Sequence, residues 1–113
     1  MMIKYDKLVR DRIPEIIEKS GGTCTTRTCR EGEFMERLVE KLEEEVAEFR
    51  RNSSLEELAD IFEVFHALID ELGGSAEEVE RIRREKLDKR GAFSRRILLI
   101  EASDPSTRPK SPK

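Results

Sequence analysis

The chain is poor in aromatic residues and in soft metal ligands. Aromatics make up 5% of its 113 residues, tryptophan is absent, and there are one histidine and two cysteines. A structural zinc site normally needs four nitrogen or sulfur ligands, and only Cys24, Cys29 and His66 offer them. We expect reduced cysteines on or near a strand, with a disulfide between them as the alternative. His66 is expected to pack beside its helix.

Long apolar runs and a strong net charge are also missing. No run approaches the roughly 20 apolar residues of a membrane span, and the polar start Met1-Met2-Ile3-Lys4 does not resemble a signal peptide. A net charge of −3 gives no general attraction to nucleic acid or to anionic membranes. We therefore expect a cytoplasmic protein with neither a nucleic acid polymer nor a membrane as its partner.

Charged residues are abundant instead, at 42% against 36% hydrophobic residues. This composition predicts a narrow core beneath a densely charged surface, and the length suits one small domain. We expect residues 1–101 to form a single domain that is mainly all-α. Residues 102–113, rich in Ser, Pro and Lys, have little to bury and are expected to form a disordered tail.

Apolar periodicity, capping residues and glycine stops predict the secondary structure. Four helices are expected, over residues 11–19, 33–51, 54–72 and 75–90. The third of these has the broadest apolar stripe, so it is expected to be the central helix. Residues 23–29 and 97–100 fit short strands that would pair as a two-stranded β element.

Two carboxylate pairs stand where the second helix ends and the third begins. The motifs contain Glu44, Glu45 and Glu48, then Glu57 and Asp60. Residues three or four positions apart are neighbours on a helix, so folding the helices together would bring four carboxylates into one cluster. Clustered carboxylates repel one another unless a hard divalent cation lies among them. The pattern therefore predicts a magnesium site.

Helical phase selects four of these carboxylates. At about 100° per residue, Glu45 lies roughly 60° and Glu48 roughly 120° to one side of the apolar stripe of the second helix. Glu57 and Asp60 project among apolar neighbours of the third helix. A charge at the edge of a packed interface between two helices is costly without a partner. Two alternatives stay open: a solvated acidic face, or a helix-capping role for Glu57.

Basic residues form two groups, one late in the fourth helix and one near the chain start. They are Lys86, Lys89 and Arg90, and Lys7, Arg10 and Arg12. Cations that face carboxylate-bound metal are typical of sites that handle polyphosphates. The alternative for the first group is stabilisation of a helix C-terminus through its dipole.

Three blocks follow one another in the order of a known family. They are Lys7-Leu8-Val9-Arg10-Asp11-Arg12-Ile13-Pro14, the carboxylate motifs that end in Glu57-Leu58-Ala59-Asp60, and residues 86–93. The chain resembles the MazG-like nucleotide pyrophosphohydrolases of the all-α NTP pyrophosphatase superfamily, most of all the single-domain phosphoribosyl-ATP pyrophosphohydrolase-like branch. The resemblance covers about residues 4–100. Two departures are a short gap from Glu48 to Glu57 and Ala92 where the branch often has glycine.

The resemblance implies a four-helix bundle, assembled as a homodimer or tetramer, that hydrolyses a nucleoside triphosphate to the monophosphate and pyrophosphate. Mg²⁺ is the implied cofactor, with Mn²⁺ as the alternative. Alternatives are phosphoribosyl-ATP hydrolysis in histidine biosynthesis and a non-catalytic oligomerising helical module.

The resemblance also implies roles for individual residues. The implied metal ligands are Glu45, Glu48, Glu57 and Asp60, which helical phase selects as well. Glu44 is the implied carboxylate that acts on the attacking water. The implied phosphate contacts are Lys86, Lys89, Arg90 and Arg10.

Overall fold

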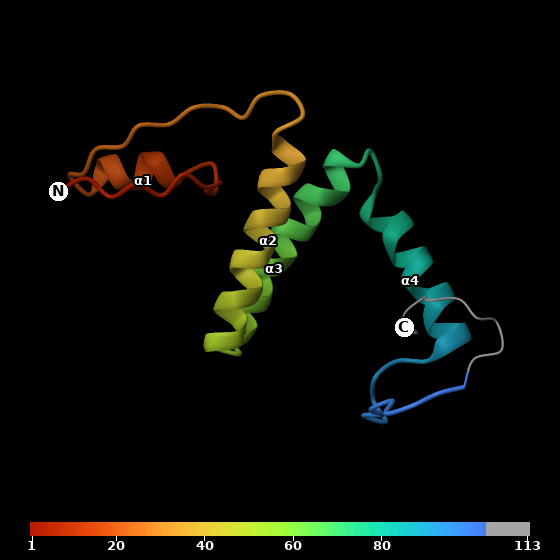
Figure 1. The fold of residues 1–113 in the computed structure, drawn as a ribbon. Coiled ribbons are helices and arrows are strands. Elements are labelled where there is room, and N and C mark those ends of the chain that lie inside the picture. The colour runs from red at the N-terminus through yellow and green to blue at the C-terminus, as the bar shows by residue number, and fades with distance from the viewer. Residues whose placement is uncertain (104–113) are drawn as a thin grey trace. The chain divides into compact units, whose positions relative to one another are not determined.

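The structure, a computed structural model, describes residues 1–103. It contains four helices, α1 (Ile13–Lys19), α2 (Phe34–Arg51), α3 (Leu55–Glu71) and α4 (Ala76–Arg90) (Figure 1). This confirms the mainly all-α class and the four predicted helices, with shifts of about two residues or fewer at their ends. The chain divides into two compact units, Met1–Gly74 and the residues from Ser75 onward. Most of the expected tail, from residue 104, lies outside the described residues.

The predicted two-stranded β element does not form. Residues 23–29 and 97–100 carry no strand, and no β-ladder occurs anywhere in residues 1–103. The two segments belong to different units. An extended segment becomes a strand only when its backbone N–H and C=O groups pair with a neighbouring segment. Local β-propensity, on which the prediction depended, cannot supply that partner.

Two long helices, α2 and α3, pack against each other as a hairpin (Figure 1). The turn between them, residues 52–54, is short, and its serines cap both helix ends. The Ser53 hydroxyl donates to the carbonyl of Phe49 at 2.9 Å, and the Ser54 hydroxyl accepts from the Glu57 backbone N–H at 3.3 Å. The end of α2 is thereby held beside the start of α3.

The core of the first unit is narrow, as the composition predicts. Among residues 1–103, the buried hydrophobic side chains are Leu38 of α2 and Val64 and Ile69 of α3. Other apolar side chains of the hairpin stay accessible, including Phe62, which is 64% exposed. No helix in the described part of the chain is long and apolar enough to cross a membrane.

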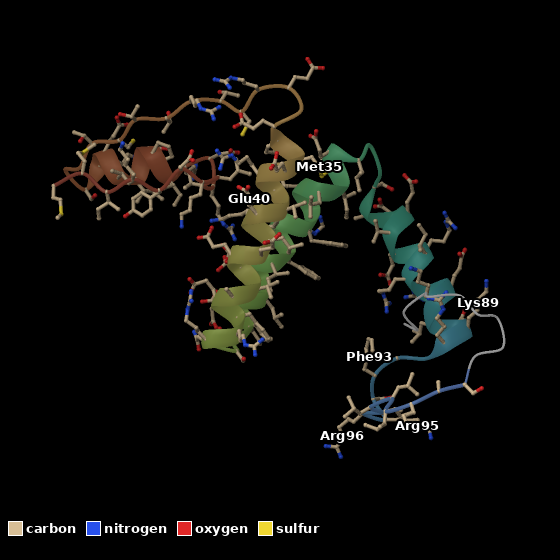
Figure 2. The ribbon with its side chains drawn as sticks, viewed as in Figure 1. Met35, Glu40, Lys89, Phe93, Arg95 and Arg96 are labelled. Carbon is tan, nitrogen blue, oxygen red and sulfur yellow. The ribbon has the colours of Figure 1, made fainter. Side chains whose placement is uncertain are left out.

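The second unit contains α4, which is highly polar and buries none of its residues. Its start is capped by Ser75, which accepts from the Glu78 backbone N–H at 3.1 Å. Ion pairs line the helix; Arg83 and Arg84 lower the pKa of the Glu80 carboxyl to about 2. Gly91, with a φ of 80°, ends the helix, and Phe93 follows as an exposed side chain (Figure 2).

Candidate metal site at the α2–α3 seam

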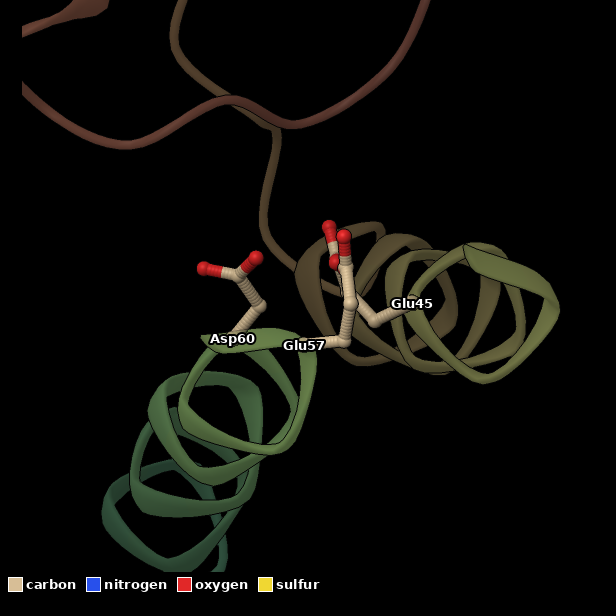
Figure 3. Close-up of side chains that lie close together, drawn as sticks. All are labelled: Glu45, Glu57 and Asp60. Carbon is tan, nitrogen blue, oxygen red and sulfur yellow. The ribbon is translucent and has the colours of Figure 1, made fainter. Parts of the chain in front are cut away.

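Three carboxylates converge where α2 and α3 pack together. Glu45 of α2 and Glu57 and Asp60 of α3 each offer an oxygen, and these oxygens lie within 4.8 Å of one another (Figure 3). The Glu45 side chain is only 12% exposed. Around Mg²⁺ at about 2.1 Å, opposite oxygen ligands stand about 4.2 Å apart. Small side-chain shifts would therefore let this oxygen set hold a hard divalent cation.

Ser54 caps α3 at the Glu57 backbone N–H, and the Glu57 carboxylate belongs to the cluster. The Glu57 backbone N–H donates to the Ser54 hydroxyl, whereas no hydrogen bond joins the Glu57 carboxylate to that hydroxyl among the described residues. At the matching α4 start, the Ser75 hydroxyl also donates to the Glu78 carboxylate at 3.2 Å. A capping box would need the Glu57 carboxylate on the Ser54 backbone N–H. No such bond occurs among the described residues, so the Glu57 side chain is left to the carboxylate cluster.

Negative charge at the seam is only partly compensated. Desolvation raises the pKa of the Glu57 carboxyl, and the charges of Asp60, Glu48 and Glu45 raise it further. No ion pair to Glu57 occurs in the described part of the chain, although Asp60 and Glu45 each have one. A cation at this position would be stabilised by the same charges that disfavour ionised Glu57.

Glu44 lies beside the triad and is held by two lysines. Lys7 Nζ donates to it at 2.5 Å and Lys41 Nζ at 3.3 Å. Desolvation opposes ionisation, but the hydrogen bonds and charges of both lysines outweigh it and lower the pKa of the Glu44 carboxyl. Lys41 also lies 3.4 Å from a Glu45 oxygen. Glu44 is therefore kept ionised, and its role as the carboxylate that acts on water stays a prediction.

Glu48, the fourth predicted ligand, does not join the converging oxygens. Its carboxylate pairs with Arg51 one turn further along α2. It still lies near enough to Glu57 to raise the pKa of that carboxyl. Its ligand role stays a prediction and requires a change of side-chain rotamer.

The predicted phosphate-binding cations fall into both units. In the first unit, Arg10 Nη2 lies 2.8 Å from Asp60 Oδ1. Lys86, Lys89 and Arg90 are exposed on the last turns of α4 and form no ion pair with any described residue. Their approach to the carboxylates stays a prediction.

The soft ligands take no part in the triad. Cys24 and Cys29 are free thiols of intermediate exposure. The His66 ring lies edge-on to the rings of Phe62 and Phe65, with 6.0 Å between ring centroids in each pair. The free thiols agree with the expected reduced cysteines, although the strand expected near them does not form. His66 lies against its helix neighbours as expected but stays exposed.

Two lysine–carboxylate contacts at the site were not predicted, although Lys7 belongs to the basic group near the chain start. Lys41 stands four residues before Glu45, and that spacing on one helix could have indicated the contact. Lys7 lies 37 positions before Glu44. No local sequence pattern predicts a contact between two residues so far apart in the chain.

Comparison with known proteins identifies one segment of similarity. The chain is 50% identical over 54 residues to an uncharacterized protein of Mycolicibacterium smegmatis (strain ATCC 700084 / mc(2)155), across 44% of this chain and 55% of that protein. The chain thus spans about half the length of this relative. No protein-family model and no solved structure matches the chain. Function must therefore be argued from the site.

Proposed function

We propose that the protein is a magnesium-dependent nucleoside triphosphate pyrophosphohydrolase that serves to clean the nucleotide pool. The observation that carries the proposal is the convergence of Glu45, Glu57 and Asp60 at the α2–α3 seam. A cluster of oxygen ligands with nearby cations suits a metal-bound polyphosphate. The sequence resemblance to the MazG-like enzymes supports the same chemistry.

Different residues of the chain would bind the metal, orient the attacking water and contact the phosphates. Glu45, Glu57 and Asp60 would hold the cation, with Glu48 as a fourth ligand after release from Arg51. Bound Mg²⁺ or Mn²⁺ would neutralise charge on the phosphate oxygens. Ionised Glu44 would accept a hydrogen bond from a water and orient it toward the α-phosphorus.

We further propose that the chain assembles as a homodimer or tetramer through α2 and α3. The hairpin exposes apolar side chains on both helices, including Val46, which is 50% exposed, and Leu58, which is 42% exposed. Apolar surface of this kind, in a unit with so narrow a core, is typical of an interface with a protein partner and supports this proposal. A second copy would cover it beside the carboxylate site.

Hydrolysis in ¹⁸O-labelled water is expected to place the label in the nucleoside monophosphate and leave free orthophosphate unlabelled. Attack at the α-phosphorus releases pyrophosphate in one step, with the new oxygen on the monophosphate. Mass spectrometry of the products from a panel of nucleotides with Mg²⁺ measures this. Label in orthophosphate would show γ-attack and contradict the proposal.

The same panel separates the rival functions. A non-catalytic helical module would release no pyrophosphate from any nucleotide, with or without Mg²⁺. A histidine-biosynthesis enzyme would hydrolyse phosphoribosyl-ATP in preference to every common nucleotide.

Lys86→Ala and Arg90→Ala are each expected to raise KM for the nucleotide about tenfold, because a charge-assisted hydrogen bond contributes about 1.5 kcal/mol. Affinity for Mn²⁺ without nucleotide should stay unchanged, since these side chains would contact phosphate. The matched control is Arg81→Ala, which removes a charge from the same helix at a residue paired with Glu85 at 2.9 Å. An equal KM rise in the control would mean a general charge effect.

A further inference from the structure

A short segment near the chain start pairs its cations with the carboxylates of the seam. We call residues 6–10 the cationic strap. Lys7 Nζ donates to Glu44 at 2.5 Å, and Arg10 Nη2 donates to Asp60 at 2.8 Å. These partners lie 37 and 50 positions further along the chain. The strap therefore joins both helices of the hairpin at the candidate metal site.

A separate contact anchors the strap to α2. Arg37 Nη1 donates to the backbone carbonyl of Asp6 and Arg37 Nη2 to its carboxylate, each at 3.1 Å. The Arg37 side chain is 22% exposed and the Asp6 side chain 82% exposed, so the anchor lies at the surface with its guanidinium partly covered. Asp6 has a φ of 45°, a left-handed conformation uncommon outside glycine. Lys7 follows directly, so this anchor positions the strap independently of the charges at the seam.

The two strap cations have partners with different roles. Lys7 holds Glu44, which lies outside the converging triad. Arg10 holds Asp60, which belongs to the triad. A divalent cation at the triad would draw Asp60 oxygens to itself and repel the guanidinium, since like charges a few ångströms apart oppose each other. Arg10 and the metal thus compete for one carboxylate, whereas Lys7 and the metal do not.

We propose that the cationic strap is an exchangeable counter-ion, an inference that rests on the proposed function. Without metal, Arg10 neutralises Asp60. When the triad takes a divalent cation, Arg10 leaves Asp60 and becomes free to bind the phosphate oxygens of the nucleotide. Lys7 stays on Glu44 and keeps the strap in place. A guanidinium suits this exchange because its planar fork matches carboxylate and phosphate alike.

Arg10→Gln should therefore change metal and nucleotide binding in opposite directions. Exposed ion pairs are weak, so removing this competitor should tighten Mn²⁺ binding by about threefold in the absence of nucleotide. With metal present, the variant should bind a non-hydrolysable triphosphate about tenfold more weakly, through loss of one charge-assisted phosphate contact. A residue that served only the fold would produce neither effect.

The test titrates the full chain with Mn²⁺ by calorimetry, comparing wild type, Arg10→Gln and the matched control Arg12→Gln. Arg12 carries the same charge two residues away and forms no ion pair among the described residues. Tighter Mn²⁺ binding in Arg10→Gln than in both other proteins supports the exchange. Equal affinity of the two variants overturns it, because a general loss of positive charge would then explain the change.

An independent readout follows Arg10 itself. Mg²⁺ should shift the Arg10 Nε–Hε signal in the nitrogen–proton NMR spectrum of the wild type, and should leave it unshifted in Asp60→Asn. An unshifted signal in Mg²⁺-bound wild type overturns the exchange.

The outcomes separate the strap from the proposed function. Failure of the wild type to bind Mn²⁺ overturns both. Metal binding and pyrophosphate release with no Arg10 effect overturn the strap alone. Exchange at Arg10 without pyrophosphate release overturns the proposed reaction alone.

Discussion

Glu57→Gln and Asp60→Asn are each expected to abolish nucleotide hydrolysis and to weaken Mn²⁺ binding by at least about 100-fold. Loss of a residue that only hydrogen-bonds to a metal ligand already lowers metal affinity by up to about 100-fold. Each variant replaces a carboxylate oxygen of the triad with a neutral amide of nearly the same shape. The cation then loses a charged ligand while the helix packing is kept. Calorimetry with Mn²⁺ and an assay of pyrophosphate release measure the two losses.

The metal-free Glu57→Gln variant should unfold at a higher temperature than the wild type at pH 7. Desolvation and neighbouring carboxylates raise the pKa of Glu57 in the folded state. A raised carboxyl pKa means that ionised Glu57 opposes folding above its ordinary pKa, and that stability falls as pH rises through the folded value. Neutral glutamine removes this penalty. The advantage should disappear below the ordinary pKa, near pH 4, where both side chains are uncharged.

The matched control is Glu63→Gln, an identical change at an exposed position of α3 outside the triad. It should retain both metal binding and hydrolysis. Severe unfolding of Glu57→Gln and Asp60→Asn would instead mark these residues as structural. Equal loss of metal binding in the Glu63 control would show that total charge, and not the triad, governs affinity.

The helices and all three residues of the triad could be predicted because their signals are local. Ser54 and Ser75 cap helices three residues before a glutamate, and both caps are present. The spacing from Glu57 to Asp60 fixes one side of the site, and a short turn brings Glu45 to it. Local spacing therefore determines both the elements and the meeting of their acidic ends.

What could not be predicted depends on contacts between distant residues or on competition between rotamers. The expected strands had suitable composition but no backbone partner. Lys7 reaches Glu44 from a segment whose Asp6 is bound by Arg37 of α2, and both contacts join residues more than 30 positions apart. Glu48 has the helical phase of a ligand, yet its carboxylate pairs with Arg51. Helical phase gives the direction of a side chain from the axis but not the partner that its charged group selects.

Phe62→Glu is expected to convert the proposed homo-oligomer to monomers. Leu58, Phe62 and Phe65 share one face of α3 by spacing, and the Phe62 and Phe65 rings stack with 6.2 Å between centroids. Phe62 is the most exposed of the three. In a symmetric dimer each substitution occurs in both copies, so the interface would bury two added carboxylates without partners, which is strongly unfavourable. Light scattering after size-exclusion chromatography measures the mass in solution.

The control for this change is Phe62→Leu, which keeps an apolar side chain at the same position and should preserve the assembly. A wild-type monomer at micromolar concentration would contradict the proposed interface outright. An oligomer that survives Phe62→Glu would place the contact on another face.

Because Phe62 follows Asp60 by two residues on α3, monomers of Phe62→Glu also show whether the triad depends on assembly. Retained Mn²⁺ affinity would mean that one chain's hairpin is sufficient to hold the metal, and lost affinity would mean that the second copy stabilises the α2–α3 seam.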